Sequence, residues 1–213
     1  MEACHPSREE MLSALEKRQG AVATRKLQAA CVAVCGLGGL GSNISISLAR
    51  AGVGKLILID FDCVDVTNLH RQQYKANQVG LPKPEALLAN LKEIAPYTEF
   101  ETHFEKVTAE NLAQLVGDAQ IICEAFDKAE AKAMLVNTVL ETMPSKYLVA
   151  ASGMAGYESG NTIRTRKITD RFYICGDGIS DVDGGIGLVA PRVMLCAAHQ
   201  ALTAIQLITG ILP

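Results

Sequence analysis

The strongest constraint on the fold is a glycine-rich turn that joins an apolar run to a predicted helix. Residues 31–35 (Cys-Val-Ala-Val-Cys) form a short, continuous apolar run, which is typical of a buried parallel strand. Gly36, Gly38 and Gly41 follow in the spacing G-x-G-x-x-G, and residues 42–51 predict a helix directly after them. Glycine at these positions allows a tight turn and lets the backbone approach a phosphate at the helix N-terminus. The segment therefore predicts a nucleotide-binding turn.

An acid ends the second predicted strand, at the place where a bound ribose would lie. Residues 55–59 predict that strand, and Asp60 follows it, nineteen residues after Gly41. A carboxylate there can accept hydrogen bonds from both ribose hydroxyls, and an unpaired surface acid at a strand end is the alternative. Asp62 has two interpretations: a direct ligand contact, or a structural role as a partner of Arg71 or a cap of the following loop.

Four polar side chains beyond this strand help to separate the candidate ligands. A triphosphate attacked at its α-phosphorus carries several negative charges, which a guanidinium and an ammonium would neutralise while amides fix its orientation. A dinucleotide used for hydride transfer does not need such a set. The alternative is a solvated polar loop, and spacing alone leaves both interpretations open. The four residues are Asn68, Arg71, Gln72 and Lys83.

Asp127 is the candidate metal ligand. It follows the apolar segment 119–124, which predicts another strand, so it would lie at the carboxyl edge where ligands of open α/β folds gather. One carboxylate that faces a phosphate suits Mg²⁺, which keeps several of its waters. An N-cap role for a helix over residues 129–141 is the alternative, and the two roles are compatible.

Predicted strands and helices alternate along most of the chain, and this order predicts a Rossmann-like, doubly wound α/β fold with a mostly parallel sheet. A short C-terminal extension follows, with a strand or hairpin, a Gly/Asp-rich crossover loop and a final helix. We expect one domain over residues 1–213, divided into N-terminal helical residues 1–30, a nucleotide-binding core 31–151 and a C-terminal segment 152–213. The other predicted helices cover 7–30, 83–94, 110–116 and 191–208, the other strands 98–107, 146–151 and 162–173, and the loop 176–187.

The composition bounds the class of protein. Apolar residues make up 49% of the chain and charged residues 20%, which is enough apolar material for a large core. The net charge of −3 argues against a nucleic-acid binder, and no apolar run approaches the length of a membrane span. The N-terminus lacks the apolar stretch of a signal peptide, so we expect a cytoplasmic protein.

Cysteine usage predicts reduced thiols. The chain has seven cysteines and no C-x-x-C pair, so neither disulfides nor a structural zinc site is expected. Cys175 stands apart because it opens the Gly/Asp-rich loop, which we expect to be mobile and exposed. It is a candidate nucleophile or persulfide acceptor, and an incidental thiol at the end of an aromatic strand is the alternative.

The combined motifs resemble the ubiquitin-activating-enzyme-like superfamily. Within it the chain is most similar to ThiF/MoeB-like proteins, and among these to a short subgroup without zinc. The resemblance spans residues 31–132. Its motifs are the glycine loop (Gly36, Gly38, Gly39 and Gly41), Ile59–Asp62, Asn68–Gln72, Gly80–Lys83 and Asp127.

The resemblance implies an ATP-dependent adenylyltransferase. The C-terminal Gly-Gly carboxylate of a small ubiquitin-like sulfur carrier, ThiS-like and serving thiamine (thiazole) biosynthesis, would attack the α-phosphate of ATP. A sulfur donor such as a cysteine desulfurase would act next. The resemblance also implies a homodimer and a carrier-binding role for residues 152–213. The implied site roles are ribose binding by Asp60 with Asp62 beside it, phosphate binding by Arg71 and Lys83, assistance by Asn68 and Gln72, and Mg²⁺ binding by Asp127.

Some positions depart from the family pattern. Lys128 and Lys132 stand where the family has an asparagine and an arginine, so we expect phosphate handling to survive through their charge. Arg18 is the candidate for an arginine that reaches the nucleotide of a partner subunit. Cys175 is the candidate for the cysteine that some relatives carry in their crossover loop.

Other functions stay open at this point. One is adenylation of another carboxylate or carrier, of the molybdopterin-synthase or tRNA-modification type. A second is an NAD-binding Rossmann module, which the glycine loop and Asp60 would fit but which leaves Asn68, Arg71 and Lys83 unexplained. A third is a nucleotide-binding scaffold without catalysis.

Overall fold

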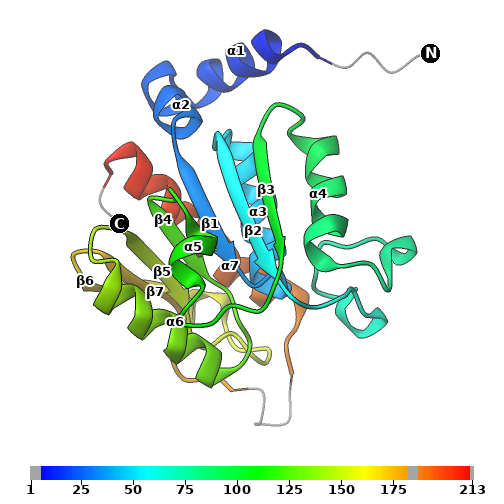
Figure 1. Cartoon of the computed structure of the whole chain (residues 1–213), viewed down its shortest axis with the longest axis vertical. Coiled ribbons are helices and arrows are strands. Elements are labelled where there is room, and N and C mark those ends of the chain that lie inside the picture. The colour runs from blue at the N-terminus through cyan, green and yellow to red at the C-terminus, as the bar shows by residue number, and fades with distance from the viewer. Residues whose placement is uncertain (1–5, 182–186, 212–213) are drawn as a thin grey trace.

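One sheet of seven strands organises the part of the chain that the computed structural model describes, residues 6–181 and 187–211 (Figure 1). The strand order is β3-β2-β1-β4-β5-β7-β6, and every neighbouring pair is parallel except β6 and β7, which are antiparallel. The predicted doubly wound, mostly parallel fold is therefore confirmed. The strands are β1 (Cys31–Cys35), β2 (Lys55–Asp60), β3 (Glu99–Phe104), β4 (Ile121–Glu124), β5 (Tyr147–Ala151), β6 (Arg164–Thr169) and β7 (Phe172–Gly176).

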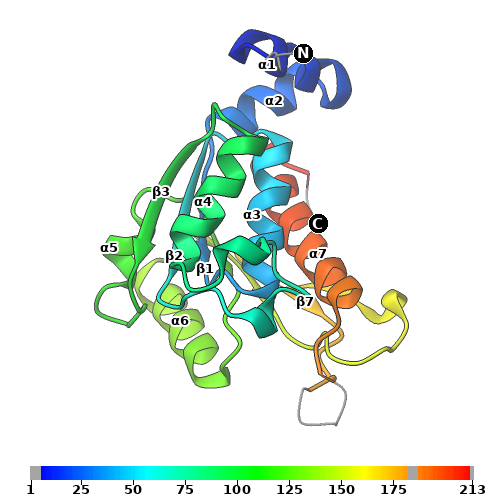
Figure 2. The same ribbon diagram turned by 90° about the vertical axis from the view of Figure 1, so that its right-hand side faces the viewer.

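Helices cover both faces of this sheet, which explains why the central strands β1 and β4 are buried along their whole length (Figure 2). α3 (Gly39–Ala51), α4 (Lys83–Ile94) and α7 (Ala190–Thr209) pack on one face, and α5 (Leu112–Val116) and α6 (Ala129–Thr142) pack on the other. Each face has its own apolar core. No helix among the described residues is both long enough and apolar enough to cross a membrane.

The remaining short elements lie at the two ends of the sheet. α1 (Arg8–Gln19) and α2 (Ala21–Gln28) lie beyond the amino ends of the strands (Figure 1). Three short 3₁₀ segments belong to loops: η1 (Val66–Asn68), η2 (Ala76–Gln78) and η3 (Gly160–Thr162).

The structure corrects two predicted elements. The single helix predicted over 7–30 is broken at Gly20, where a φ of 90° ends α1 and starts α2. The hairpin predicted over 162–173 extends to Gly176, because the backbone of β7 pairs with β5 as far as Cys175. Cys175 therefore lies inside a strand. The predicted bounds of β1 and α4 are confirmed.

The strand order fixes where a ligand would bind. The chain runs outward from β1 through β2 to β3, then crosses to the other side of β1 to form β4 and β5. In open α/β sheets ligands bind at such a reversal, beyond the carboxyl ends of the two flanking strands, which here are β1 and β4. The glycine loop and the residue Asp127 follow these two strands directly.

Candidate functional site

The glycine loop is fixed by close backbone contacts. Gly36 has a φ of 92°, and a Cβ there would lie 2.8 Å from the carbonyl oxygen of Ala125. A Cβ on Gly41 would lie 1.8 Å from the carbonyl oxygen of Gly36. Gly38 is the N-cap of α3 and offers no side chain to the first N–H groups of the helix. Those N–H groups and the helix dipole form a site for an anion such as phosphate.

Asp60 ties this loop to the end of β2. Its carboxylate accepts hydrogen bonds from the backbone N–H of Leu37 (2.6 Å) and of Asp62 (2.8 Å). Burial raises the pKa of this carboxyl, and the nearby charge of Lys83 opposes that rise. Each carboxylate oxygen keeps a lone pair beyond these bonds. The side chain is therefore held at the loop and can still accept from a ribose.

Asp62 forms an ion pair with Lys83, with 3.0 Å between Oδ2 and Nζ. The predicted pairing of Asp62 with Arg71 is wrong, and so is its predicted capping role, because Asp65 caps the following loop through the N–H of Thr67. Lys83 is buried at the first turn of α4, whereas Asp62 is half exposed. The pair places a buried cation next to the nucleotide turn.

Arg71 forms no ion pair with any carboxylate in the described ranges. Its Nη1 donates to the carbonyl of Thr67 (3.2 Å) and lies 3.3 Å from Nε2 of His70, while its Nε is buried without a partner. Its positive charge is therefore available to a ligand. The Oδ1 of Asn68 accepts from the N–H of Asp65 at 3.3 Å, so Asn68 also orders the loop that carries Arg71.

Gln72 lies against the glycine loop. Its Nε2 is 3.6 Å from the position that a Cβ would take on Gly38, and the side chain is buried. Its Oε1 has no hydrogen-bond partner within residues 6–181 and 187–211. Buried polar atoms without partners are rare, so this amide is a candidate for a ligand contact.

Asp127 follows β4 at the carboxyl edge and is exposed. The predicted N-cap role is wrong, because Lys128 occupies the N-cap of α6 and no side chain caps that helix. The carboxylate of Asp127 makes no hydrogen bond or ion pair with any other described residue. No group of three or more metal-ligating side chains gathers in the same ranges. A single carboxylate plus phosphate oxygens is nevertheless a set that suits Mg²⁺.

The prediction that Lys132 handles phosphate is wrong. Its Nζ lies 3.0 Å from both carboxylate oxygens of Glu124 and 3.0 Å from the carbonyl oxygen of Ala151. The Glu124 side chain is fully buried, and that burial raises its pKa while Lys132 opposes the rise. Sequence reasoning missed this pair because Glu124 ends an apolar strand without any local signal. Lys132 is therefore a structural cation.

Arg18 lies far from the site of its own chain. It is exposed near the end of α1, where the neighbouring Gln19 donates to the carbonyl of Ala51 at the last residue of α3 (2.9 Å). The thirteen residues of α3 span about 20 Å between that point and the glycine loop. Arg18 therefore does not join the site within one chain.

Cys175 is fully buried, so the predicted exposed and mobile thiol is wrong. Its Sγ lies 3.5 Å from Oγ1 of Thr165 and 3.9 Å from Oγ1 of Thr203, and burial raises its pKa. The exposed cysteine of the described ranges is Cys63, which directly follows Asp62 at the site. No local feature of the sequence indicated that Cys63 would be exposed and Cys175 buried.

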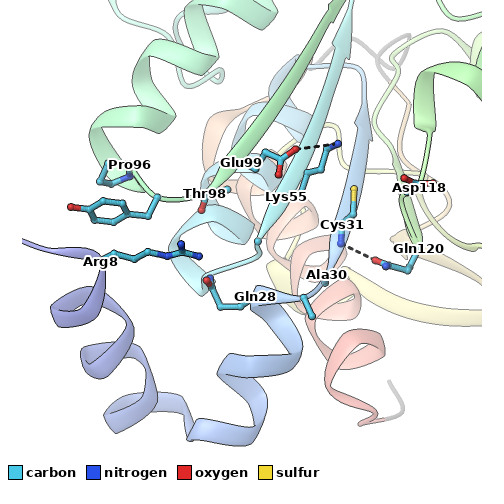
Figure 3. Close-up of a pocket in the computed structure, with 13 residues that line it drawn as sticks. Arg8, Gln28, Ala30, Cys31, Lys55, Pro96, Thr98, Glu99, Asp118 and Gln120 are labelled. Carbon is cyan, nitrogen blue, oxygen red and sulfur yellow. Dashed lines mark hydrogen bonds and ion pairs between the residues drawn. The ribbon is translucent and has the colours of Figure 1, made fainter.

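A hollow of about 580 Å³ lies at the amino edge of the sheet, opposite the carboxyl-edge residues described above (Figure 3). Lys55, which lines this hollow, already forms ion pairs through its Nζ with Oε1 of Glu99 (3.3 Å) and Oε2 of Glu101 (2.8 Å). Gln120 is also occupied, because its Oε1 accepts from the N–H of Cys31 at 2.7 Å. The hollow contains none of the predicted site residues.

The fold and the carboxyl-edge residues together define a doubly wound α/β protein with an anion-binding helix terminus and two cations beside it. The sequence profile of the ThiF family matches residues 8–213, and the chain belongs to this family. The predicted resemblance to ThiF/MoeB-like proteins is thereby confirmed.

Two curated relatives illustrate the family. The molybdopterin-synthase adenylyltransferase of Haemophilus influenzae is 33% identical over 187 residues, which cover 85% of this chain and 75% of the relative. The adenylyltransferase and sulfurtransferase UBA4 of Lodderomyces elongisporus is 31% identical over 196 residues, which cover 88% of this chain. The match spans only 42% of that relative.

Solved structures share the fold. The E. coli tRNA N6-threonylcarbamoyladenosine dehydratase TcdA, in complex with ATP, superposes with a TM-score of 0.85 at 22% identity, over 97% of this chain and 98% of that chain. E. coli MccB with ATP gives a TM-score of 0.69 at 23% identity, over 90% and 59% of the two chains.

Proposed function

We propose that this chain is an ATP-dependent adenylyltransferase that activates the C-terminal Gly-Gly carboxylate of a small ubiquitin-like sulfur carrier as an acyl-adenylate. The observation that carries the proposal is that two cations flank the glycine turn: the stem of Arg71, which has no carboxylate partner among the described residues, lies against Gly39, and the buried Lys83 lies near Asp60. Two cations at an anion-binding helix terminus suit a triphosphate better than the two phosphates of NAD.

The chemistry follows from the geometry. An ionised carboxylate needs no general base: its oxygen forms a new bond to the α-phosphorus of ATP, the bond to the β-phosphate breaks, and pyrophosphate leaves with the electron pair. The N–H groups of the glycine loop hold phosphate oxygens, Asp60 binds the ribose, and Arg71 and Lys83 offset the charge that develops. Asn68 and Gln72 orient the loop and the ligand.

Asp127 is the residue that would hold Mg²⁺. Its exposed carboxylate stands on the edge of the sheet toward which the phosphates would point. When bound, the ion would supply further neutralisation of the leaving pyrophosphate. Lys128, exposed beside it, is the cation that this chain has in place of a neutral side chain.

The relatives support the class of the substrate. Among them are a molybdopterin-synthase adenylyltransferase and combined adenylyltransferase and sulfurtransferase proteins. The proposal for this chain covers the adenylation step, with a cysteine desulfurase-type donor supplying sulfur afterwards. The finer proposal is a ThiS-like carrier in thiazole formation, with a molybdopterin-synthase carrier as the competing partner.

We also propose that the working form is a homodimer. Exposed apolar side chains of α7, which include Met194, Leu195 and Leu202, would form the two-fold interface. Arg18 would then reach the nucleotide of the partner subunit.

The test is ATP–pyrophosphate exchange driven by purified carriers. A ThiS-like and a molybdopterin-synthase-type carrier, each ending in Gly-Gly, are compared with the same carriers lacking the last two glycines. We expect exchange only with an intact tail, and faster exchange with the ThiS-like carrier. Exchange that is absent with both intact carriers contradicts the proposal, and faster exchange with the second carrier corrects the pathway.

The site residues are tested in the same assay. Arg71→Ala and Asp127→Ala should each lower exchange by about 100-fold, the usual scale for losing one charge-stabilising group. Calorimetric titration of ATP and NAD, with and without Mg²⁺, separates this function from an NAD-binding module. Tight NAD binding without ATP binding contradicts the proposal.

A further inference from the structure

Arg192 is a buried hub that joins three segments of the C-terminal region. It lies in the first turn of α7, and only 3% of its surface is exposed. Its Nη1 donates to the carbonyls of Glu158 (2.6 Å) and Ser159 (2.9 Å), and its Nη2 donates to Oγ1 of Thr162 (3.1 Å) and to Oδ2 of Asp177. One guanidinium therefore binds the start of α7 to the segments on both sides of the β6–β7 hairpin.

Asp177 completes the hub from its other oxygen. Its Oδ1 accepts from the backbone N–H groups of Ile179 and Ser180, each at 2.8 Å. Asp177 thus orders the beginning of the Gly/Asp-rich loop and pairs with Arg192 at the same time. Asp177, which lies in the loop predicted over residues 176–187, therefore has a structural role as the partner of Arg192.

The first turn of α7 also touches the candidate phosphate site. A Cβ on Gly39 would lie 2.9 Å from Cγ1 of Val193 and 3.5 Å from Cγ of Arg71. The start of α7, the start of α3 and the aliphatic stem of Arg71 therefore meet at one glycine. Val193 is packed so closely against Gly39 that its side chain cannot move nearer to α3 without a clash.

A second contact links the same turn to Arg71 through His70. The carbonyl oxygen of Leu188, just before α7, lies 3.3 Å from Nε2 of His70, and Nη1 of Arg71 lies 3.3 Å from the same nitrogen. Nδ1 of His70 lies 2.9 Å from the carbonyl of Thr67. With its Nδ1–H donated to Thr67, the neutral imidazole accepts from the guanidinium of Arg71 at Nε2, and the carbonyl of Leu188 packs beside that nitrogen without a hydrogen bond.

We propose that Arg192 is a positioning residue for the phosphate-binding Arg71, which it fixes through Val193, Leu188 and His70. The inference rests on the proposed function, because it assigns ATP phosphates to Arg71. No carboxylate of the described ranges holds Arg71, so its guanidinium is placed by these neutral contacts and by its hydrogen bond to the carbonyl of Thr67. The four hydrogen bonds of the Arg192 guanidinium fix the first turn of α7, so losing them would loosen the contacts that position Arg71.

The test compares Arg192→Lys with the wild type by calorimetric titration of Mg-ATP. Lysine keeps the charge but cannot reproduce the fork of four hydrogen bonds, so we expect ATP affinity to fall by about 10-fold. In an Arg71→Met background the same Arg192→Lys change should alter ATP affinity by less than about 2-fold, because the two residues act along one path. Asp177→Asn, which keeps the shape of the acid, should give a smaller loss.

A matched control uses Arg171, which also donates to a carbonyl, that of Ser145 at 2.8 Å, and lies beside β7 at the opposite edge. Arg171→Lys should leave ATP affinity unchanged. Thermal unfolding of each variant establishes that the titrated protein is folded, and should Arg192→Lys not fold, the comparison is made with Asp177→Asn.

The outcomes are distinguishable. If the wild type binds ATP and Arg71→Met weakens binding, but Arg192→Lys lowers the melting temperature without changing ATP affinity, the positioning role is overturned and the proposed function stands. Equal losses from Arg192→Lys in both Arg71 backgrounds also overturn it. A wild type that binds no ATP overturns both proposals.

Discussion

Two glycines of the nucleotide turn, Gly36 and Gly41, are required for different physical reasons. Gly36 needs both a positive φ and free space, whereas Gly41 has ordinary helical backbone but a carbonyl oxygen within 1.8 Å of any Cβ. A methyl group at Gly41 therefore cannot be accommodated by a side-chain movement. It must displace the turn itself, since the obstructing atom belongs to the backbone of Gly36.

We expect Gly41→Ala to lower the free energy of unfolding by more than about 3 kcal/mol, the scale of severe overpacking against rigid structure. Gly80→Ala is the control, because Gly80 has a φ of 89° but nothing within 4 Å of its Cβ position. That variant should cost only about 1 kcal/mol of backbone strain. Urea unfolding measures both, and equal losses would contradict the steric explanation.

Asp177 predicts a measurable acid dependence. Burial raises its pKa, but hydrogen bonds from Ser180, Ile179 and Arg192 outweigh that effect and lower the pKa from 3.8 to about 2. A carboxyl with a lowered folded-state pKa stabilises the protein above its unfolded pKa, and the contribution disappears as the pH falls toward the folded pKa.

We expect Asp177→Asn to lose about 2 kcal/mol of stability at pH 6, and the difference from wild type to shrink between pH 4 and pH 2. Urea unfolding at pH 6, 4 and 3 measures this difference. Asp170→Asn is the control, since that acid pairs with Lys167 on the surface and should show little change. A difference between wild type and Asp177→Asn that stays constant with pH would contradict the assignment.

At the scale of secondary structure, α6 adds to its apolar packing on the sheet a charge pair between Lys132 and the buried Glu124. Lys132 reaches Glu124 at the end of β4 and the carbonyl of Ala151 at the end of β5. Removing only the cation leaves a buried carboxylate without compensation, which costs far more than the pair itself contributes.

Lys132→Met should lower the free energy of unfolding by about 3–5 kcal/mol. Adding Glu124→Gln should recover most of that loss, because the uncompensated charge is then gone. Lys128→Met, on the exposed neighbouring position, should have no effect on stability. Chemical denaturation of the four proteins provides the comparison, and a harmless Lys132→Met would mean that the pair is not stabilising.

Local signals decided which elements could be predicted from sequence. The bounds of α4 follow from Pro82 and Pro84 at its start and Pro96 after its end, and those of β1 from its continuous apolar run. The same logic failed at Cys175 and Lys132, because their surroundings depend on strand pairing and on a distant buried acid. Glycine spacing located the turn, but the partners of Asp62 and Arg192 lie in segments that only the folded chain brings together.

At the scale of the whole molecule, α1, which carries Arg18, contacts the C-terminal end of α3, whereas the glycine loop forms its N-terminal end. If Arg18 contributes to catalysis, it must do so across a subunit interface. Within one chain the separation of about 20 Å exceeds the reach of any side chain.

Mixing two inactive variants tests this arrangement. We expect Arg18→Ala and Arg71→Ala to lose exchange activity separately and to regain about a quarter of wild-type activity when equal amounts are unfolded and refolded together. Random pairing makes half of the dimers mixed, and each mixed dimer has one intact site of two. A mixture as inactive as its components would exclude action in trans, and a monomer in sedimentation would exclude the dimer.

The position of Cys63 beside Asp62 allows ligand binding at the site to be followed by thiol modification. Its thiol is exposed and adjoins Asp62, whereas the other cysteines within the described ranges, Cys31, Cys35, Cys123, Cys175 and Cys196, are buried. Once Cys4, outside those ranges, is replaced by serine, a thiol reagent should modify essentially one atom of the native protein. Bound nucleotide should slow that modification, and a rate indifferent to ATP would place the nucleotide elsewhere. The modification rate of Cys63 would thus report how far the site is occupied. It allows the affinities of different ligands to be compared before any carrier protein has been identified.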